Sequence, residues 1–269
     1  MKVELLDGLK SDFIFRGKNA KIEPYENYSV ISDLDQPYSY FANFILFENP
    51  PENKIKAEKL FDQHFGDHPE IKHKLIYWQN KKVSEKIAQE FLNCNYIFES
   101  ITTLSMTPDN LKTVNKKLNK NYIIRKFNSH NDWEKWRELE FLEVAYDYEK
   151  EAYEKYIDKK IENYQNLIAQ NKGFWIGVFN DDELIANMGL FFKDNLARFQ
   201  MVRTKKAYRN QGICANLLYY TAKLGFEKAN KLLIVADTND IAINIYKRLG
   251  FKEEETSYNF QLCDSAATS

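Results

Sequence analysis

Cysteine is scarce in this chain, and its three copies, Cys94, Cys214 and Cys263, stand far apart in the 269 residues. So few and so widely spaced thiols exclude a disulfide framework, and they lack the paired spacing of a zinc site. We therefore expect no bound metal. Unpaired thiols suit a reducing compartment, so we predict a cytoplasmic protein.

Long apolar runs are missing as well. Met1–Lys10 leads into Ser11 and Asp12 without the apolar core of a signal peptide. No window approaches the roughly 20 apolar residues that a membrane-spanning helix needs. The sequence therefore predicts neither export nor a membrane partner.

The chain also lacks an excess of charge of either sign. Lys and Arg number 38 against 39 Asp and Glu, which gives a formal net charge of -1. A chain with this balance has no broadly basic surface, so we expect no nucleic-acid partner. Its length favours about two domains and a sizeable core.

Negative charge is missing from one stretch in particular. Between Asn195 and Phe226 there is no Asp or Glu. The basic residues of this stretch gather around one loop: Arg198, Arg203, Lys205, Lys206 and Arg209. A local positive field of this kind suits a polyphosphate ligand.

The same stretch has the pattern of a strand, a loop and a helix. Phe199–Val202 is an apolar strand, and residues 209–214 form the loop. Gly212 lets backbone N–H groups approach a bulky anion, and the helix that begins there points its free donors and positive dipole end at the same place. We therefore predict a phosphate-binding turn at Gly212. The expected apolar face of this helix is made of Ile213, Leu217, Tyr220 and Leu224.

Arg209, Gly212 and Cys214 give the loop the spacing Arg-x-x-Gly-x-Cys, and Asn239, Ala242, Tyr246 and the pair Gly250 and Phe251 follow downstream. This combination resembles the GNAT superfamily of acyl-CoA-dependent N-acetyltransferases, whose loop reads Arg/Gln-x-x-Gly-x-Gly/Ala. Cys214 departs from that pattern, although cysteine is still a small residue. The resemblance covers roughly the C-terminal half and implies the mixed α/β fold of the family.

The resemblance implies that acetyl-CoA is the cofactor and that its diphosphate lies on the loop. In the family the strand before the loop bonds the pantetheine amides, a role that falls here on Val202 and Thr204. The family's tyrosine that protonates the departing thiolate corresponds to Tyr246, which is the expected catalytic residue. The expected cofactor-binding residues are Val202, Arg203, Thr204, Arg209, Asn210, Gln211, Gly212, Ile213, Cys214, Asn239 and Tyr246.

Three of these residues have a second interpretation. Tyr246 can be an ordinary aromatic residue of an amphipathic helix, since it shares a face with Ile245 and Leu249. Asn239 has the residue type of a helix N-cap, while in the family an Asn here also touches the cofactor. Cys214, in the first turn of a helix among basic residues, should react readily unless a bound cofactor shields it.

The implied reaction is direct transfer of an acetyl group to a primary amine of a small molecule or a protein. A Lys amine has a pKa of about 10.4 and an α-amine one of about 7.7 to 8.0, so some group must take a proton from the acceptor. The segment that borders the acceptor cleft in the family carries Glu138, Glu140, Glu143 and Asp147. The residues alone do not choose among them, and they can also be solvated helix charges. Tyr146, Tyr148 and Tyr153 either line the cleft or belong to the core.

The N-terminal half shows a faint internal repeat. A shift of 155 residues places Phe91 on Tyr246, Asn95 on Gly250 and Tyr96 on Phe251. A helix is expected to end here in both copies, with strand-like residues after it. We interpret residues 1–118 as a degenerate GNAT-like domain without the glycine loop, and residues 119–269 as the catalytic domain. The alternative is that units of helix and strand recur by chance.

Three expectations concern single elements. Tyr38–Phe47 has the composition of a strand, and Tyr96–Met106 that of two strands. Thr107–Lys120, rich in Lys and Asn, has the composition of a linker.

Two other functions fit parts of the pattern. One is a non-catalytic acyl-CoA-binding or regulatory module. The other is a tandem-domain aminoacyl or peptidyl transferase of the FemX type, which duplicates the same fold but generally lacks the intact CoA loop, so that Arg209–Cys214 argues against it. The sequence leaves open which amine is acetylated and whether the chain forms a homodimer.

Overall fold

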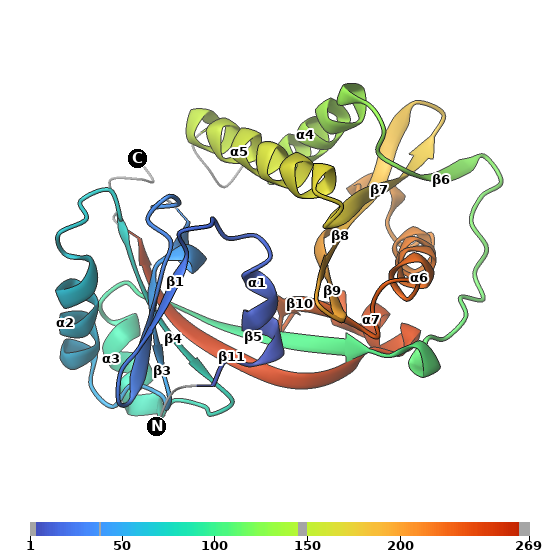
Figure 1. Ribbon diagram of the computed structural model, residues 1–269. Helices are drawn as coiled ribbons and strands as arrows, with labels where there is room; N and C mark the ends of the chain where they lie inside the picture. Colours follow the sequence, from blue (N-terminus) through green and yellow to red (C-terminus); the bar gives the residue numbers. More distant parts are fainter. Residues whose placement is uncertain (1–3, 38, 145–149, 264–269) are drawn as a thin grey trace. The chain divides into compact units, whose positions relative to one another are not determined.

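The computed structural model describes residues 4–37, 39–144 and 150–263 (Figure 1). These residues form two compact units. The first unit takes the described residues up to Thr103, together with Ala236–Asp240 and those from Glu254 on. The second unit takes Leu104–Val235 and Ile241–Glu253. The chain therefore returns to the first unit twice after leaving it.

The first unit is a mixed sheet with strand order β1-β2-β3-β4-β11-β5. The pairs β1–β2, β2–β3 and β4–β11 are antiparallel, whereas β3–β4 is parallel. Its strands are β1 (Lys21–Pro24), β2 (Tyr28–Ser32), β3 (Phe44–Phe47), β4 (His73–Gln79), β5 (Ile97–Met106) and β11 (Lys252–Cys263). Its helices are α1 (Asp7–Asp12), α2 (Lys54–Phe65) and α3 (Glu85–Leu92).

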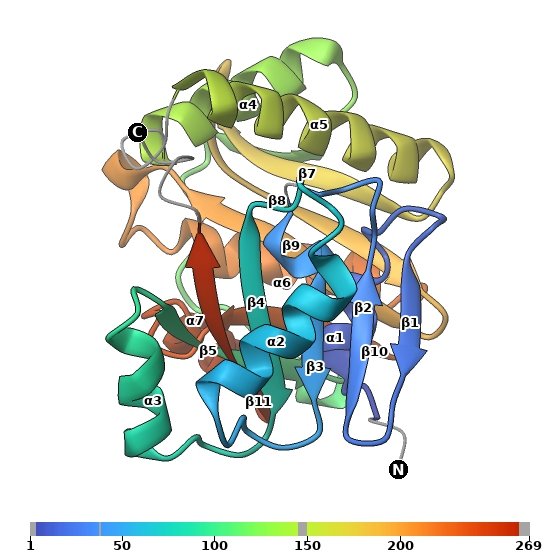
Figure 2. The same cartoon turned by 90° about the vertical axis from the view of Figure 1, so that its left-hand side faces the viewer.

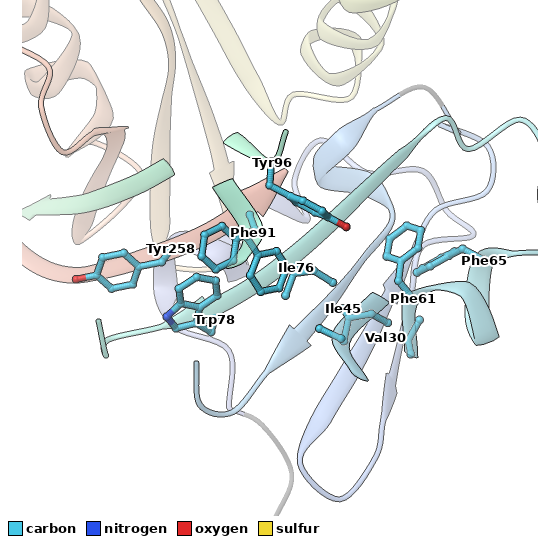
Figure 3. Packing of buried hydrophobic residues seen from close by; sticks show 11 residues of the cluster. Val30, Ile45, Phe61, Phe65, Ile76, Trp78, Phe91, Tyr96 and Tyr258 are labelled. Atoms are coloured by element: carbon cyan, nitrogen blue, oxygen red, sulfur yellow. The ribbon is translucent and has the colours of Figure 1, made fainter. Parts of the chain in front are cut away.

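Alternating apolar residues give this sheet two covered faces. Val30, Ile45 and Ile76 join Phe61 and Phe65 of α2 in one buried cluster, which Phe91 of α3 completes by stacking on Phe260 at 4.0 Å between ring centroids (Figure 3). The next residue of each strand points to the opposite face. A second cluster there contains Leu9 of α1 with Ile31, Phe44, Leu46, Leu75 and Tyr77. Figure 2 shows α2 in front of β3 and β4, and α1 behind the strands.

The second unit contains the strand order β10-β9-β8-β7-β6. The pairs β6–β7, β7–β8 and β8–β9 are antiparallel, and β9–β10 is parallel. Its strands are β6 (Tyr122–Lys126), β7 (Gly173–Asn180), β8 (Glu183–Lys193), β9 (Leu196–Thr204) and β10 (Lys231–Asp237). Its helices are α4 (His130–Val144), α5 (Lys150–Ala169), α6 (Ile213–Gly225) and α7 (Ile243–Leu249).

Helices cover both faces of the second sheet. Tyr164 of α5 packs against Trp175 of β7 and Phe191 of β8, with ring centroids 4.7 and 5.4 Å away. Gly225 of α6 packs instead on Leu190, the neighbour of Phe191 in β8. Adjacent residues of a strand face opposite sides, so α5 and α6 lie on opposite faces of the sheet (Figure 1).

The internal repeat is visible in the way α3 and α7 end. After α3, Asn95 has a positive φ of 62°, and the N–H of Tyr96 donates to the carbonyl of Phe91 at 3.2 Å. After α7, Gly250 has a φ of 110°, and the N–H of Phe251 donates to the carbonyl of Tyr246 at 3.1 Å. The residue pairs are those that the shift of 155 superposes, so both helices end in the same left-handed turn.

Strand directions repeat as well. In each half of the chain antiparallel strands precede a parallel pair that a helix connects, namely β3–α2–β4 in the first half and β9–α6–β10 in the second. Parallel neighbours need such a crossover, so the same connection occurs twice. The mixed α/β fold with two similar halves is therefore confirmed. The division of the sequence at residues 118 and 119 stays a prediction.

Three local expectations are wrong. Within 39–47 only Phe44–Phe47 is a strand, because Tyr40–Ala42 forms a short 3₁₀ turn and the Asn43 side chain bonds the N–H of Asp33 at 3.0 Å. The two strands expected over Tyr96–Met106 are the single strand β5. In α6 the ring of Tyr220 is 44% exposed, and the face that packs on the sheet instead carries Leu218, Thr221, Ala222 and Gly225 beside Ile213 and Leu217.

One buried ion pair fastens β6 to the start of α4. The Asp132 side chain is 1% exposed and accepts two hydrogen bonds from the Arg125 guanidinium, at 2.6 and 2.8 Å, and others from the N–H groups of Asn128 and Ser129. The hydrogen bonds from Arg125 are the largest of the effects that lower the pKa of Asp132 to about 2.

Asp132→Asn is expected to lower the free energy of unfolding at pH 7 by about 2 to 3 kcal/mol, because a carboxylate whose pKa is depressed stabilises the folded state above its ordinary pKa of about 3.9. This stabilisation is lost as pH falls from about 4 toward 2. Urea unfolding of both proteins at pH 7 and pH 3 measures the difference, which should shrink at the lower pH. Asp158→Asn, in an exposed pair with Arg137, is the control and should cost less than about 1 kcal/mol. Equal losses in the two variants would contradict this assignment.

Candidate functional site

The site expected from the sequence begins where β9 separates from β10. Parallel pairing covers Leu196–Arg198 with Lys231–Leu233, but β9 continues to Thr204. On its other side β9 pairs with β8, and the register shifts between Asn187 and Gly189. Met201, at this irregularity, has a φ of 49°. The bulge and the separation leave the later part of β9 with a backbone edge that β10 does not pair, which suits an extended polar ligand.

The chain after β9 turns sharply into α6. Gly212 is the N-cap residue with a φ of 81°, and Asn210 just before it has a φ of 63°. The first helical hydrogen bond runs from the N–H of Asn216 to the carbonyl of Gly212 at 3.1 Å. The N–H groups of the first turn precede this bond and point out of the helix start, where the helix dipole is positive.

Carboxylates from other elements pair with the basic residues around this turn. Arg203 bonds Glu140 of α4 at 2.7 Å, and Arg209 bonds Glu143 of α4 at 2.6 Å. Lys205 pairs with Glu183 of β8. The positive field expected from a stretch without Asp or Glu is therefore partly neutralised by the fold.

Glu140 and Glu143 attach α4 to the end of β9. Glu140 is fully buried, and burial raises the pKa of its carboxyl, while the guanidinium of Arg203 acts in the opposite direction. The carboxylate of Glu143 also holds the loop, because it accepts hydrogen bonds from the N–H of Lys206, at 2.8 Å, and from the Arg209 side chain. Two of the four base candidates are thus engaged in holding the loop.

The remaining base and cleft candidates differ in position. Glu138 is exposed and lines a pocket with Lys135, Asp182 and Glu183. Tyr153 is 6% exposed and packs edge-on against Phe141, so it belongs to the core. Asp147, Tyr146 and Tyr148 lie outside the described residues.

Tyr246 lies in α7, which packs beside α6. Its side chain is 4% exposed, and its ring stands 6.2 Å from that of Phe251. Phe251 in turn lies 5.9 Å from Phe199 of β9. These contacts connect the expected catalytic tyrosine with the strand that separates from β10.

Asn239 belongs to the segment Ala236–Asp240 of the first unit. Its N–H donates to the side chain of Asp237 at 2.7 Å, and α7 starts later, at Ile243, with Ala242 as the N-cap residue. The expectation that Asn239 caps this helix is therefore wrong. Asn239 lies in a turn that Asp237 stabilises instead.

Lys116, a residue of the expected linker, lies on the Gly212 turn and was missed in the sequence. Its ammonium donates to the carbonyl of Asn210 at 2.9 Å, and its carbonyl accepts from the Asn216 side chain at 2.7 Å. Nearby, the hydroxyl of Tyr122 donates to the Gln211 side chain at 3.3 Å. A long-range contact of one lysine in a polar segment gives no periodic signal, so the sequence could not indicate it.

The residues at the turn fit a diphosphate rather than a metal. N–H donors at a helix start, with lysine and arginine side chains near them, are suited to a phosphate anion. In the described ranges, no group of three or more His, Cys, Asp or Glu side chains is placed to hold a metal ion. No helix within these ranges is long and apolar enough to cross a membrane.

Solved structures with the same fold cover nearly the whole chain. A conserved protein of unknown function from Staphylococcus epidermidis has a TM-score of 0.75 at 13% identity, over 90% of this chain and 94% of its own. A GCN5-related N-acetyltransferase from Kribbella flavida has a TM-score of 0.63 at 15% identity, over 94% and 93%. A tandem GNAT protein from the clavulanic acid biosynthesis pathway has a TM-score of 0.56 at 9% identity, over 94% and 86%. The fold is thus the GNAT fold in two halves.

Residues 131–251 match the model of the Acetyltransferase (GNAT) family. This range contains β9, the Gly212 turn, α6 and Tyr246. The chain therefore carries a domain of the GNAT acetyltransferase family, and the resemblance inferred from the loop is confirmed. No curated protein matches the sequence.

Gly250→Ala is expected to destabilise the protein by more than about 2 kcal/mol. A Cβ at Gly250 would lie 1.8 Å from the carbonyl oxygen of Asn110, and φ is 110° there. Asn95→Ala, at the equivalent helix end in the first unit, strains only the backbone and should cost about 1 kcal/mol. Urea unfolding compares the two variants. A loss no larger in Gly250→Ala than in Asn95→Ala would show that the Asn110 contact is unimportant.

Proposed function

We propose that this protein is an N-acetyltransferase that moves an acetyl group from acetyl-CoA to a primary amine of a small molecule or protein. The observation that carries the proposal is the separation of β9 from β10 after Arg198, next to a helix start at Gly212. Both features lie in the segment that matches the GNAT family model. An unpaired strand edge followed by a set of N–H donors suits a ligand that has amides at one end and phosphates at the other.

The cofactor would lie along these features. Val202, Arg203 and Thr204, after the bulge, would present backbone groups to the pantetheine amides. The turn from Arg209 to Cys214, with Asn210, Gln211, Gly212 and Ile213 between them, would hold the diphosphate. Asn239, which the resemblance also assigned to the cofactor, remains part of the proposal only through that resemblance. When bound, acetyl-CoA supplies an acyl thioester.

The chemistry asks three things of the residues of this chain. A carboxylate or water must take a proton from the acceptor amine, whose nitrogen then attacks the thioester carbonyl. A backbone N–H of β9 would donate to the carbonyl oxygen as the carbon–nitrogen bond forms. The Tyr246 hydroxyl would give its proton to the sulfur as the carbon–sulfur bond breaks, which is reasonable because a phenol has a pKa of about 10.

Of the two equivalent helices α2 and α6, the second has the helix start suited to this task. The equivalent helix in the first half, α2, begins at Asn53, whose side chain accepts from the N–H of Lys56 at 3.0 Å. Pro50 and Pro51 before it have no N–H to offer, and Glu52 adds negative charge. The Asn53 cap takes one of the donors of this helix start, and no glycine before it opens an approach to the others, so we propose one cofactor per chain.

Cysteine alkylation tests cofactor binding without knowledge of the acceptor. Cys214 is half-buried in the first turn of α6, whereas Cys94 is exposed in the first unit. Saturating acetyl-CoA, whose sulfur is acylated and does not consume the reagent, should slow the reaction of Cys214 with iodoacetamide by about tenfold or more, because a cofactor on the turn covers the thiol. The rate at Cys94 should not change, and peptide mass mapping separates the two sites. Equal rates at Cys214 with and without acetyl-CoA would contradict the binding site.

Tyr246→Phe tests catalysis. A panel of amines and peptides is screened for release of free thiol from acetyl-CoA, and the best acceptor is used to compare the two proteins. Loss of the acid should lower turnover by about a hundredfold, while the dissociation constant of CoA changes little. Tyr219→Phe, on α6, is the control and should keep full turnover.

Two outcomes would point elsewhere. Undiminished turnover in Tyr246→Phe would remove this residue from the mechanism. CoA binding by the wild-type protein without turnover on any acceptor of the panel would favour the second candidate, a non-catalytic acyl-CoA-binding module. The 4% exposure of the Tyr246 side chain is the observation that keeps this candidate open.

A further inference from the structure

The segment between β5 and β6 is fastened along the helices of the proposed site. The carbonyl of Asn110 lies against Gly250, and the N–H of Lys112 donates to the carbonyl of Leu249 at 2.9 Å. Four residues later, Lys116 reaches the start of α6. The segment expected to be a linker therefore runs from the end of the helix with Tyr246 to the turn proposed to hold the diphosphate.

Lys116 brings a positive charge to this turn that no carboxylate of the described residues neutralises. Its ammonium contacts only a carbonyl, that of Asn210, at 2.9 Å. Arg203 and Arg209, by contrast, each contact a glutamate. A carbonyl is a neutral acceptor, so the full charge of Lys116 remains available to an anion beside it.

The methylene groups of Lys116 occupy the open side of Gly212. A Cβ at Gly212 would lie 3.0 to 3.4 Å from three carbons of this side chain. A diphosphate that approaches the N–H groups of the turn through this space would meet the lysine first. The exposed ammonium can leave Asn210 at little cost, because water replaces the bond, and a hydrogen bond to an anionic oxygen is stronger than one to a carbonyl.

We propose that Lys116 is a further cofactor-binding residue, which exchanges the carbonyl of Asn210 for the diphosphate of CoA and uncovers Gly212 as it does so. The proposal rests on the proposed function, since it assigns a new residue to the same cofactor site. It makes the segment between the two halves of the sequence a part of the cofactor site.

Calorimetric titration with CoA tests the proposal in the full-length protein. Lys116→Met keeps an unbranched side chain of similar length but removes the charge, and it should raise the dissociation constant of CoA by about tenfold. Lys116→Arg keeps the charge and should stay within about threefold of wild type. Lys117→Met, at the exposed neighbouring position, is the matched control and should bind like wild type.

Two further ligands assign the effect to a phosphate. Dephospho-CoA keeps the diphosphate, so Lys116→Met should weaken its binding by the same factor as that of CoA. Pantetheine has no phosphate, and the variant should bind it as wild type does.

The outcomes separate this proposal from the proposed function. If the wild-type protein binds CoA and Lys116→Met binds it equally tightly, the role of Lys116 is overturned and the proposed cofactor site stands. If Lys116→Met loses affinity for CoA but not for dephospho-CoA, the lysine contacts the 3′-phosphate, which contradicts the exchange at Gly212. Failure of the wild-type protein to bind CoA would overturn both.

Discussion

Backbone N–H groups without partners are the constraint on which the site depends. β9 leaves β10 after Arg198, and α6 begins soon afterwards at Gly212, so two sets of donors open close together in the chain. Neither set can be satisfied by the sheet or the helix itself. Met201 and Gly212, both with a positive φ, mark the bulge in β9 and the helix start eleven residues later. A ligand with amides and phosphates in sequence would satisfy both sets together.

Charge around the turn is balanced rather than simply positive. Glu140 and Glu143 reach β9 and the loop from α4. Each pairs with an arginine that the family resemblance assigns to the cofactor. These pairs fix the position of the loop before any ligand arrives, which reduces the entropy lost on binding. They also lower the attraction that the arginines can exert on an anion. Lys116 restores part of it from a different segment.

The sequence predicted the elements well where the pattern is local. The helix with Gly212 at its start and the helix end at Gly250 follow from residue types that favour those conformations. The internal repeat could be recognised in the sequence because the 155-residue shift pairs Asn95 with Gly250, and both residue types tolerate a left-handed turn. The face of α6 was less predictable, because Tyr220 is apolar enough to be buried and yet remains 44% exposed. Contacts between distant segments, such as Lys116 with Asn210, leave no such pattern in the chain.

The strand order of the first unit has a consequence for the making of the protein. β11, the last strand of the chain, lies between β4 and β5 and pairs with β4 from Ser257 to Cys263. Phe260 of this strand stacks on Phe91, and with Tyr258 it completes a core whose other buried members come from the first hundred residues. During synthesis the first unit must therefore wait, with an interior strand missing, until residues 252–263 have left the ribosome.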